Sequence, residues 1–586
     1  MQFSKFSRLF AACTIAVASV FVLNSCKEDE EVFPAPTVSP GAETSGVPGA
    51  KVNVTASVSA PAGLKTLTIL KNGSPFDTKT YTGNETADSY SKEYTIENLA
   101  ANTVVNFTVI ATDSKNQASA PVTVTVKVTA VPPKEIVVVK GLLTGNITWT
   151  KNKIYKLSGF VRVGGDTTET AAANVATGTL TIEAGTVIIG ERATKGTLII
   201  QRGSKIIANG TASEPIVFTS ERGVGEREAG DWGGLVICGK AKNNLPGGSA
   251  QLEGSYKAWH GGSDDTDNSG SLKYVRVEYA GVPINPNQEI NSFTFGSVGS
   301  GTTLEYLQAS YGGDDSYEWF GGAVNAKYLV AYRGLDDDFD MDNGFRGYIQ
   351  FAVGLRGSTI ADQSGSNGFE VDNDGQGTAS EPFTSPTLAN VSLIGAKQTQ
   401  ETFISTLFQN GMHLRRNNKI KVYNTFVTGY PNGVYIDGST TAANANAGQL
   451  VLNNVVIAGV TGWGTNGWGQ GAATQPQGFP VRDINTSSPA GDLSIGSQKP
   501  SAWFAAQPGN KALASWTTSG ISNTVFGAGR PTFTLTTSAT DALSKGASAV
   551  TLPAFFTATD YVGAFKDSDW TATWAEFNPS SIVYIK

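Results

Sequence analysis

A short internal repeat near the middle of the chain constrains the fold more than any other feature. The segment EYLQASYGGDDSYEWFGG (305–322) aligns with KYLVAYRGLDDDFDMDNG (327–344), and the two share a tyrosine, an alanine, two glycines and an Asp-Asp pair. An earlier partial copy, KYVRVEYAG, occupies residues 273–281. A unit this short cannot bury its own apolar face, so we expect successive copies to stack on one another.

Two further motifs repeat downstream of these copies. One is Asn-Gly followed by strict alternation, in NGFEVD (367–372), NGMHLR (410–415) and NGVYID (432–437). The other is an asparagine with a glycine five residues later, at Asn390, Asn424 and Asn454. Alternation predicts strands with one buried face, and equivalent asparagines can hydrogen-bond from one coil to the next. These patterns predict a right-handed parallel β-helix, because a propeller blade needs about 40 residues or more.

The segments GTLTIEAGTVIIGE (178–191) and GTLIIQRGSKIIANGTASEPIVFTS (196–220) resemble the opening coils of pectin-lyase-like proteins. The resemblance covers most of residues 140–480 and implies the β-helix fold, but it says little about function. We therefore assign residues 137–550 to the β-helix. Residues 551–586 break the repeat and are rich in aromatic residues, so we expect them to cap the last coil.

The N-terminal segment 1–25 has the pattern of a signal peptide. Lys5 and Arg8 precede an apolar stretch that ends near Leu23, and this stretch is shorter than the roughly 20 residues of a membrane span. The end, LNSC, resembles a bacterial lipobox, which implies lipidation of Cys26 after cleavage; a simple secretory signal is the alternative. The acidic tether that follows (26–33) contains KEDEE, which resembles the surface-export signal of Bacteroidetes lipoproteins. We expect a lipid-anchored protein of the outer membrane that faces the cell exterior.

Residues 34–130 contain short alternating strands with turn signals such as Asn72-Gly73 between them. They resemble the immunoglobulin-like modules of surface lipoproteins, and residues 131–136, which include VPPKE, are the predicted linker. The predicted fold class is therefore all-β, an immunoglobulin-like sandwich followed by a right-handed parallel β-helix. Cys238, in an apolar run, is expected to be a small buried side chain without a disulfide partner.

Strand parity places the acidic residues of DFDMDNG (338–344). If Phe339 and Met341 point into the coil, Asp338, Asp340 and Asp342 point outward. The same parity in every copy predicts two outward columns of side chains. The columns are Glu318, Asp340, Glu370, His413 and Tyr435, and Phe320, Asp342, Asp372, Arg415 and Asp437.

The columns allow a cation site, an active site or a solvated acidic face. Stacked carboxylates repel one another, which favours a cation, a basic neighbour or a raised pKa. The segment EVDNDGQGTASE (370–381) places Glu370, Asp372, Asp374 and Glu381 at positions 1, 3, 5 and 12 of a calcium-loop pattern. The presence of only two histidines and no cysteine pair argues against zinc.

Catalysis is a further possibility for the same face. The candidate catalytic residues are Asp340, Asp342, Glu370, Asp372, His413 and Arg415. Carboxylate pairs could act as general acid and base on a glycosidic bond, or Ca²⁺ with Arg415 could acidify a uronate. His413 could transfer a proton. The set of motifs typical of polygalacturonases, which includes Gly-His-Gly, is absent from the sequence.

Ligand contacts are expected from both columns and from glycine-rich loops. Tryptophans on such loops can present flat faces to sugars, although they can equally pack on the coil beneath. The candidate ligand-binding residues are Glu318, Tyr435, Asp437, Trp259, Trp463 and Trp468.

We expect a surface lipoprotein whose β-helix binds an extracellular glycan or another polymer, beside an outer-membrane transporter. A polysaccharide lyase or glycoside hydrolase is the second hypothesis, and a structural surface protein or adhesin is the third. Ca²⁺ is the one cofactor that the sequence suggests. The net charge of -7, with no basic patch, argues against nucleic acid as a partner.

Overall fold

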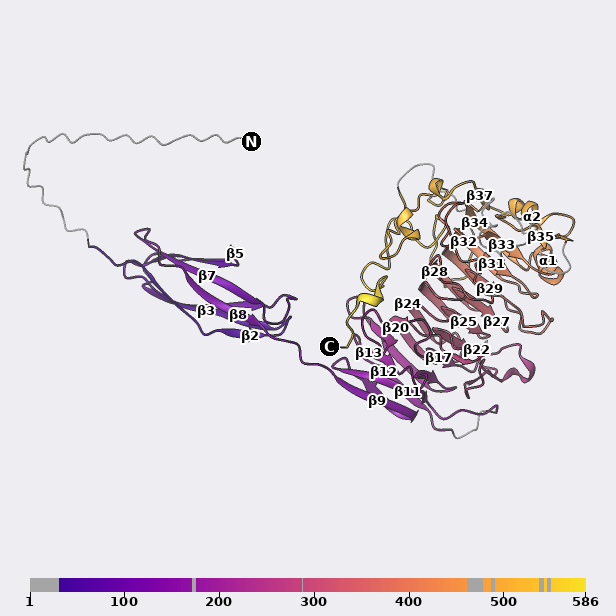
Figure 1. Ribbon diagram of the computed structural model, residues 1–586, viewed down its shortest axis with the longest axis horizontal. Coiled ribbons are helices and arrows are strands. Elements are labelled where there is room, and N and C mark those ends of the chain that lie inside the picture. The colour runs from indigo at the N-terminus through magenta and orange to yellow at the C-terminus, as the bar shows by residue number, and fades with distance from the viewer. Residues whose placement is uncertain are drawn as a thin grey trace, which may run out of the picture. The chain divides into compact units, whose positions relative to one another are not determined.

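The computed structural model describes residues 31–170, 175–286, 288–460, 478–485, 491–536, 542–544 and 550–585. The chain divides into two compact units, Met1–Pro132 and Pro133–Lys586 (Figure 1). The first is a β-sandwich and the second a parallel β-helix, so the predicted fold class is confirmed. No helix in the described ranges has the length and apolar character needed to cross a membrane.

The first unit packs two sheets against each other. Alternate residues of the strands point into the space between the sheets, where Leu67, Ile69, Phe107 and Val126 are fully buried. The smaller sheet contains β1 (Thr37–Pro40), β3 (Lys51–Ser59) and β6 (Ala87–Thr95). The larger contains β2 (Thr44–Gly46), β8 (Val122–Val128), β7 (Val104–Asp113), β4 (Leu64–Lys71) and β5 (Ser74–Thr80).

The second unit is one parallel sheet wound into coils, with 23 strands in the described residues. Each regular coil contributes a strand to three parallel columns, and Figure 1 shows the strands stacked in chain order. The first column carries the candidate site. Its strands follow β11 (Lys153–Val163) and are β14 (Thr197–Ile200), β17 (Leu235–Cys238), β23 (Phe293–Gly296), β25 (Tyr317–Phe320), β27 (Phe339–Asp342), β29 (Phe369–Val371), β31 (Asn410–Leu414) and β33 (Asn432–Ile436).

The other two columns merge in the later coils into single bent strands. The early strands are β9 (Glu135–Leu143), β10 (Gly145–Trp149), β11 (Lys153–Val163), β12 (Gly178–Ile182), β13 (Val187–Gly190), β15 (Lys205–Asn209) and β16 (Ile216–Ser220). The bent strands are β20 (Gly270–Glu278), β24 (Thr303–Ser310), β26 (Asn325–Tyr332), β28 (Tyr348–Leu355), β30 (Thr387–Ile394), β32 (Lys421–Thr428) and β34 (Val451–Ala458), and β37 (Lys511–Leu513) pairs with the last of them.

Short elements outside the coils complete the second unit. Three antiparallel hairpins are formed in its described residues by β18 (Ala250–Gln251) and β19 (Trp259–His260), β21 (Pro283–Asn285) and β22 (Gln288–Glu289), and β35 (Ile484–Asn485) and β36 (Gly491–Asp492). The helices found there are α1 (Ser439–Asn446), α2 (Pro500–Ala506), η1 (Pro246–Gly248), η3 (Trp516–Thr518), η4 (Asn523–Phe526) and η5 (Pro579–Ser581).

The bend in the long strands is made by one residue per coil in the left-handed region. The later coils use Asn390, Asn424 and Asn454, with φ of 56°, 48° and 55°. Asn454 Nδ2 donates to Asn424 Oδ1 at 2.8 Å, which confirms the predicted bonding between asparagines of neighbouring coils. A second ladder joins Asn367, Asn410 and Asn432, which lie at or just before the first residues of β29, β31 and β33. Their side-chain amides form hydrogen bonds of 3.0 and 3.3 Å. Both ladders hold the coils in register.

The interior of the β-helix is a stack of large apolar side chains. The ring centroid of Tyr317 lies 5.1 Å from that of Phe293 and 5.4 Å from that of Phe339. Trp319 and Met341 are fully buried beside them. Cys238, in β17, is free and fully buried, as predicted. This rigid core fixes the direction of every outward side chain on the site column.

The C-terminal segment runs back along successive coils, as the yellow trace in Figure 1 shows. It bonds in turn to Gln350 through Thr557, to Gln308 through Glu576 and to Arg227 through Pro579. Residues 551–585 therefore lie along the side of the coils, whereas the sequence predicts a cap over the last coil. The glutamine amides of the coils bond the segment's backbone, and these contacts hold it to the flank.

Candidate functional site

The predicted register of the site column is confirmed. Glu318 pairs with Asp340, Asp340 with Glu370, Glu370 with His413, and His413 with Tyr435. Neighbouring strands are about 4.8 Å apart, so these side chains stand one above another on the outside of the coils.

Parity within β27 is also confirmed, but it does not extend to Asp338. Phe339 and Met341 are buried in the core, while Asp340 and Asp342 line an open cleft. Asp338 precedes the strand, and its fully buried carboxylate accepts from Arg356 and from the Tyr430 hydroxyl, each at 3.0 Å. The prediction that Asp338 points outward is therefore wrong, because alternation holds only inside a regular strand.

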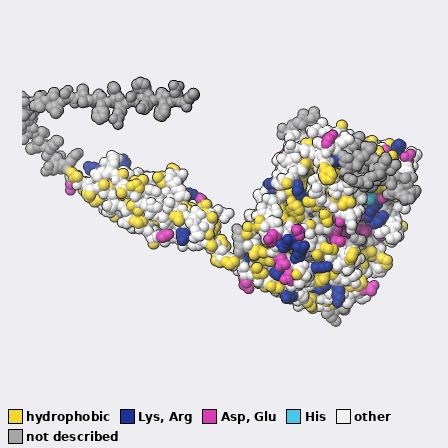
Figure 2. Space-filling view, in the orientation of Figure 1, with side chains coloured by type: hydrophobic (Ala, Val, Ile, Leu, Met, Phe, Trp, Pro, Cys, Tyr) yellow, Lys and Arg dark blue, Asp and Glu magenta, His cyan; other side chains and the backbone are white. Residues whose placement is uncertain are grey.

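The cleft has a volume of about 680 Å³ and an unusually acidic lining. Figure 2 shows Asp and Glu side chains gathered over β25 and β27. The cleft is lined by Glu253, Glu289, Gly313, Asp314, Asp315, Glu318, Asp336, Asp340, Asp342, Asp362, Gln363, Ser364, Glu370, Asp372, Arg415 and Arg416. Eleven of these side chains are carboxylic acids, whereas two are basic.

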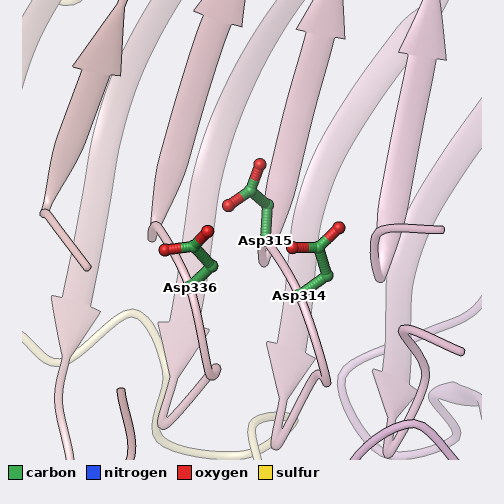
Figure 3. Close-up of side chains that lie close together, drawn as sticks. All are labelled: Asp314, Asp315 and Asp336. Carbon is green, nitrogen blue, oxygen red and sulfur yellow. The ribbon is translucent and has the colours of Figure 1, made fainter. Parts of the chain in front are cut away.

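Three groups of carboxylates, in the cleft and directly beside it, converge closely enough to share a cation. The groups are Asp314 with Asp315 and Asp336, Asp315 with Glu318 and Asp340, and Asp337 with Asp340 and Glu370. Within each group the ligand oxygens lie within 4.8 Å of one another. Asp315 and Asp340 each belong to two groups, so the three form one continuous chain. Figure 3 shows the first group on the turns that lead into β25 and β27.

Glycines allow these turns to pack closely. A Cβ added at Gly312 would lie 2.5 Å from Ser292 Oγ, and one at Gly334 would lie 2.7 Å from Ser316 Oγ. The repeated glycine before each Asp-Asp pair therefore lets neighbouring turns approach. This approach places Asp314 and Asp315 beside Asp336.

Burial makes ionisation of these acids unfavourable. Together with repulsion by neighbouring carboxylates, it raises the pKa of Asp314, Asp315, Glu318 and Asp340 well above the ordinary value. Burial also raises the pKa of Asp336 to about 6, and burial with repulsion from Asp372 raises that of Asp342 to about 8. Two ionised carboxylates one strand apart repel by roughly 3 kcal/mol at an effective dielectric of about 20.

Basic side chains neutralise the other end of the column. Arg415 contacts Glu370 and donates to Asp372 at 2.9 Å, and Arg416 donates to Asp372 at 2.6 Å. Burial opposes ionisation of Glu370, but His413 and Arg415 outweigh it and lower the pKa of Glu370.

His413 is held between two carboxylates at this end. Its Nε2 lies 3.2 Å from Asp437 Oδ2 and its Nδ1 lies 3.6 Å from Glu370 Oε2. Burial alone would lower the pKa of His413, but these carboxylates raise it. The ring also stacks on Tyr435, with centroids 5.0 Å apart.

A protein-family model for the pectate-lyase-like β-helix domain matches residues 141–472, which is more than half of the chain. The chain belongs to this family. A comparison with curated proteins finds no match.

Two solved structures resemble parts of the chain. The fibronectin(III)-like modules of Clostridium thermocellum CbhA are 22% identical, cover 16% of this chain and 47% of their own, and give a TM-score of 0.13. The Yersinia enterocolitica family 28 exopolygalacturonase is 12% identical, covers 73% of this chain and 91% of its own, and gives a TM-score of 0.17. This chain thus spans less than half of the fibronectin(III)-like chain. Neither similarity bears on the function of the pectate-lyase-like β-helix.

The calcium loop predicted at residues 370–381 does not gather its four ligands in this pectate-lyase-like β-helix. Asp374 accepts bonds from the backbone N–H groups of Gln376 and Thr378, and Glu381 is exposed. Of the four residues, only Glu370 belongs to one of the carboxylate groups in the described part of the chain. The carboxylates that the fold does gather lie on neighbouring coils, whereas the loop pattern assumes ligands from one continuous segment.

The remaining candidate residues lie beside the cleft or outside the described ranges. His413, Tyr435 and Asp437 are next to the cleft but do not line it, and Trp259 lies on β19, away from its lining. Trp463, Trp468 and Cys26 lie outside the described residues.

Several cleft residues were not among the candidates of the sequence analysis. Glu253 comes from the β18–β19 hairpin, Glu289 from β22, and Asp362 from the segment between β28 and β29. These segments do not repeat, so nothing in the sequence places them against the column. The Asp-Asp pairs did carry a signal, because they recur at the same place in both copies of the repeat and must stack.

Proposed function

We propose that this protein is a cell-surface lipoprotein whose β-helix binds an anionic extracellular polysaccharide through divalent cations held in the acidic cleft. The observation that carries the proposal is the continuous chain of converging carboxylates on β25, β27, β29 and the turns before β25 and β27. The lipobox-like LNSC and the acidic tether support attachment of the chain to the outer membrane.

The need for a cation follows from the partners of the carboxylates. Among the described residues, no Lys, Arg or His forms an ion pair with Asp315, Glu318 or Asp340. The buried Oδ1 atom of Asp340 has no hydrogen-bond partner there. A buried carboxylate without a partner is costly, and a hard divalent cation removes that cost. Oxygen ligands alone favour Ca²⁺ or Mg²⁺ over zinc.

The anionic nature of the ligand follows from the same charges. An open cleft with eleven acids repels a uronate or sulfated polymer until cations neutralise the lining. A cation with incomplete protein ligation then offers positions to carboxylate or sulfate groups of the polymer, and Arg416, which is partly exposed, adds a positive charge at the rim. Binding of a polymer at the cell surface suits a role beside an outer-membrane transporter.

Cleavage of the polymer is a second candidate function, and the paired end of the column favours it. His413 lies between Glu370 and Asp437, within the same column as the acids of the cleft. A protonated imidazole there could donate a proton to a leaving group. Arg415 forms ion pairs with Glu370 and Asp372, and although burial lowers its pKa, these carboxylates raise it. Arg415 therefore stays charged, and its role would be electrostatic.

The proposal is tested by measuring binding of polygalacturonate to the purified protein with Ca²⁺ and with EDTA. We expect binding with Ca²⁺, loss of binding with EDTA, and loss in the Glu318→Gln variant. Equal binding under both conditions would overturn the role of the cation. Absorbance of the unsaturated product, recorded in the same samples, reports eliminative cleavage, and a reducing-sugar assay reports hydrolysis.

Attachment to the membrane needs a separate measurement. Metabolic labelling with a radioactive or clickable palmitate should label the wild-type chain and leave a Cys26→Ala variant unlabelled. Protease accessibility on intact cells then distinguishes the outer from the inner face of the membrane.

A further inference from the structure

The turns before β25 and β27 hold a cluster of acids that differs from the outward column on the strands. Asp314, Asp315 and Asp336 come from two neighbouring turns and lie close together (Figure 3). Their oxygens lie within 4.8 Å of one another. Two oxygens on opposite sides of a calcium ion are about 4.6–5.2 Å apart, twice the usual Ca²⁺–O distance. The cluster therefore has a suitable size for a calcium ion.

Unpartnered oxygen atoms distinguish this cluster from a solvated acidic patch. Asp315 is 7% exposed, and one of its oxygens accepts from the backbone N–H of Asp337 at 2.8 Å. Its other oxygen has no hydrogen bond or ion pair with any described residue. Oδ1 of Asp336 is buried without a partner among these residues, while its other oxygen accepts from Ser364 at 2.6 Å. A missing ligand with positive charge accounts for the buried Oδ1 atom of Asp336.

Asp315 also belongs to the group that contains Glu318 and Asp340. A carboxylate has about four lone-pair positions, so one side chain can bridge two cations while keeping its bond to the Asp337 N–H. The turn cluster and the strand group are then adjacent sites that share a ligand. The internal repeat produces this arrangement, because it places an Asp-Asp turn and an acidic strand in each of two consecutive coils.

We infer that the cleft holds two divalent cations at once, one in the turn cluster Asp314–Asp315–Asp336 and one in the strand group Asp315–Glu318–Asp340, bridged by Asp315. The strand cation faces the polymer, and the turn cation fixes the turns that position it. This inference rests on the proposed function for the role of the strand cation, but the existence of the turn site does not depend on polymer binding.

Calcium titration by calorimetry tests the inference on the purified protein. We expect two cations per wild-type chain and one in each of the Asp336→Asn and Glu318→Gln variants. Asp315→Asn should weaken both sites by more than about tenfold, because ligand charge sets affinity. The matched control is Asp362→Asn, which removes one charge from the same cleft but belongs to none of the groups, and it should keep two cations. Circular dichroism confirms that each variant is folded.

The outcomes separate this inference from the proposed function. One cation or none in the wild type, or an unchanged count in Asp336→Asn, would overturn the two-site arrangement. If the wild type binds one cation and still captures polygalacturonate, the inference fails and the proposed function stands. If it binds two cations and captures no anionic polysaccharide, the turn site stands and the proposed function fails.

Discussion

The two ends of the acidic column share one backbone geometry but differ in how their charges are compensated. On β29 to β33, Glu370, Asp372 and Asp437 have arginine or histidine partners. On β25 and β27, the acids in the same column have no ion-pair partner among the described residues. The difference teaches that stacking brings charges together without deciding how they are neutralised. Where the chain supplies no base, protonation of the acids, whose pKa values are raised, or the proposed cation neutralises them.

The largest expected effect comes from turning a paired, buried carboxylate into an unpaired one. Arg356→Ala would leave the buried Asp338 without its ion-pair partner, with the Tyr430 hydroxyl as its remaining hydrogen-bond donor. We expect a loss of about 3–5 kcal/mol in the free energy of unfolding, measured by urea denaturation. The Arg356→Leu, Asp338→Asn double variant should recover a large part of this loss. Equal stability of the single and double variants would contradict the assigned pairing.

The two histidines extend the comparison to bases. His413 has carboxylate partners, whereas His260 is buried against Ser297 Oγ, and burial lowers the pKa of His260 to about 3. The unfolded chain binds a proton at this histidine below pH 6.5, and the folded chain does not until about pH 3, so stability falls as the pH falls through that window. We expect a loss of roughly 1.4 kcal/mol per pH unit below about 6.5. Denaturation of wild type and His260→Gln at pH 7 and pH 5 measures this difference, and parallel curves would contradict it.

Removing Arg415 should make the acids beside it resemble the acids on β25 and β27, which have no basic partner among the described residues. Arg415→Ala leaves Glu370 and Asp372 with fewer positive neighbours, so the protein without calcium should lose about 1–3 kcal/mol. The stabilisation gained on adding Ca²⁺ should increase, as measured by thermal melting with and without the ion. If Ca²⁺ stabilises the variant no more than the wild type, removal of Arg415 does not create a cation site at Glu370 and Asp372.

The smallest effect is expected at the unpaired end. Asp340→Asn removes one of several mutually repelling acids, so at pH 8 without calcium the variant should be more stable by about 1 kcal/mol. Adding Ca²⁺ should reverse the order of stability, because only the wild type keeps the full ligand set. Thermal melting in EDTA and in Ca²⁺ checks both parts. A destabilised variant in EDTA would show that this carboxylate is compensated without a cation.

Much of the column could be predicted because the sequence repeats. Alignment of the two copies placed Glu318 on Asp340, and the Asn-Gly motifs carried the register on to Glu370 and His413, as the strand pairing confirms. Prediction failed at Asp338, where a regular strand had not yet begun. Of the four calcium-loop residues, only Glu370 joins the converging carboxylates of the described residues, because a pattern of spacing along one segment does not include side chains from the next coil.

The sequence by itself determined the fold class, the register of the coils and the outward face of the strands, because periodic apolar positions can be buried in only one way. The tertiary structure alone decided which acids have basic partners, that Glu253 and Glu289 line the cleft, and that the Asp-Asp turns converge. The physical reason is the separation, along the chain, of the residues that interact. Periodicity is local and can be read along the chain, whereas compensation of charge depends on distances between segments that no repeat relates.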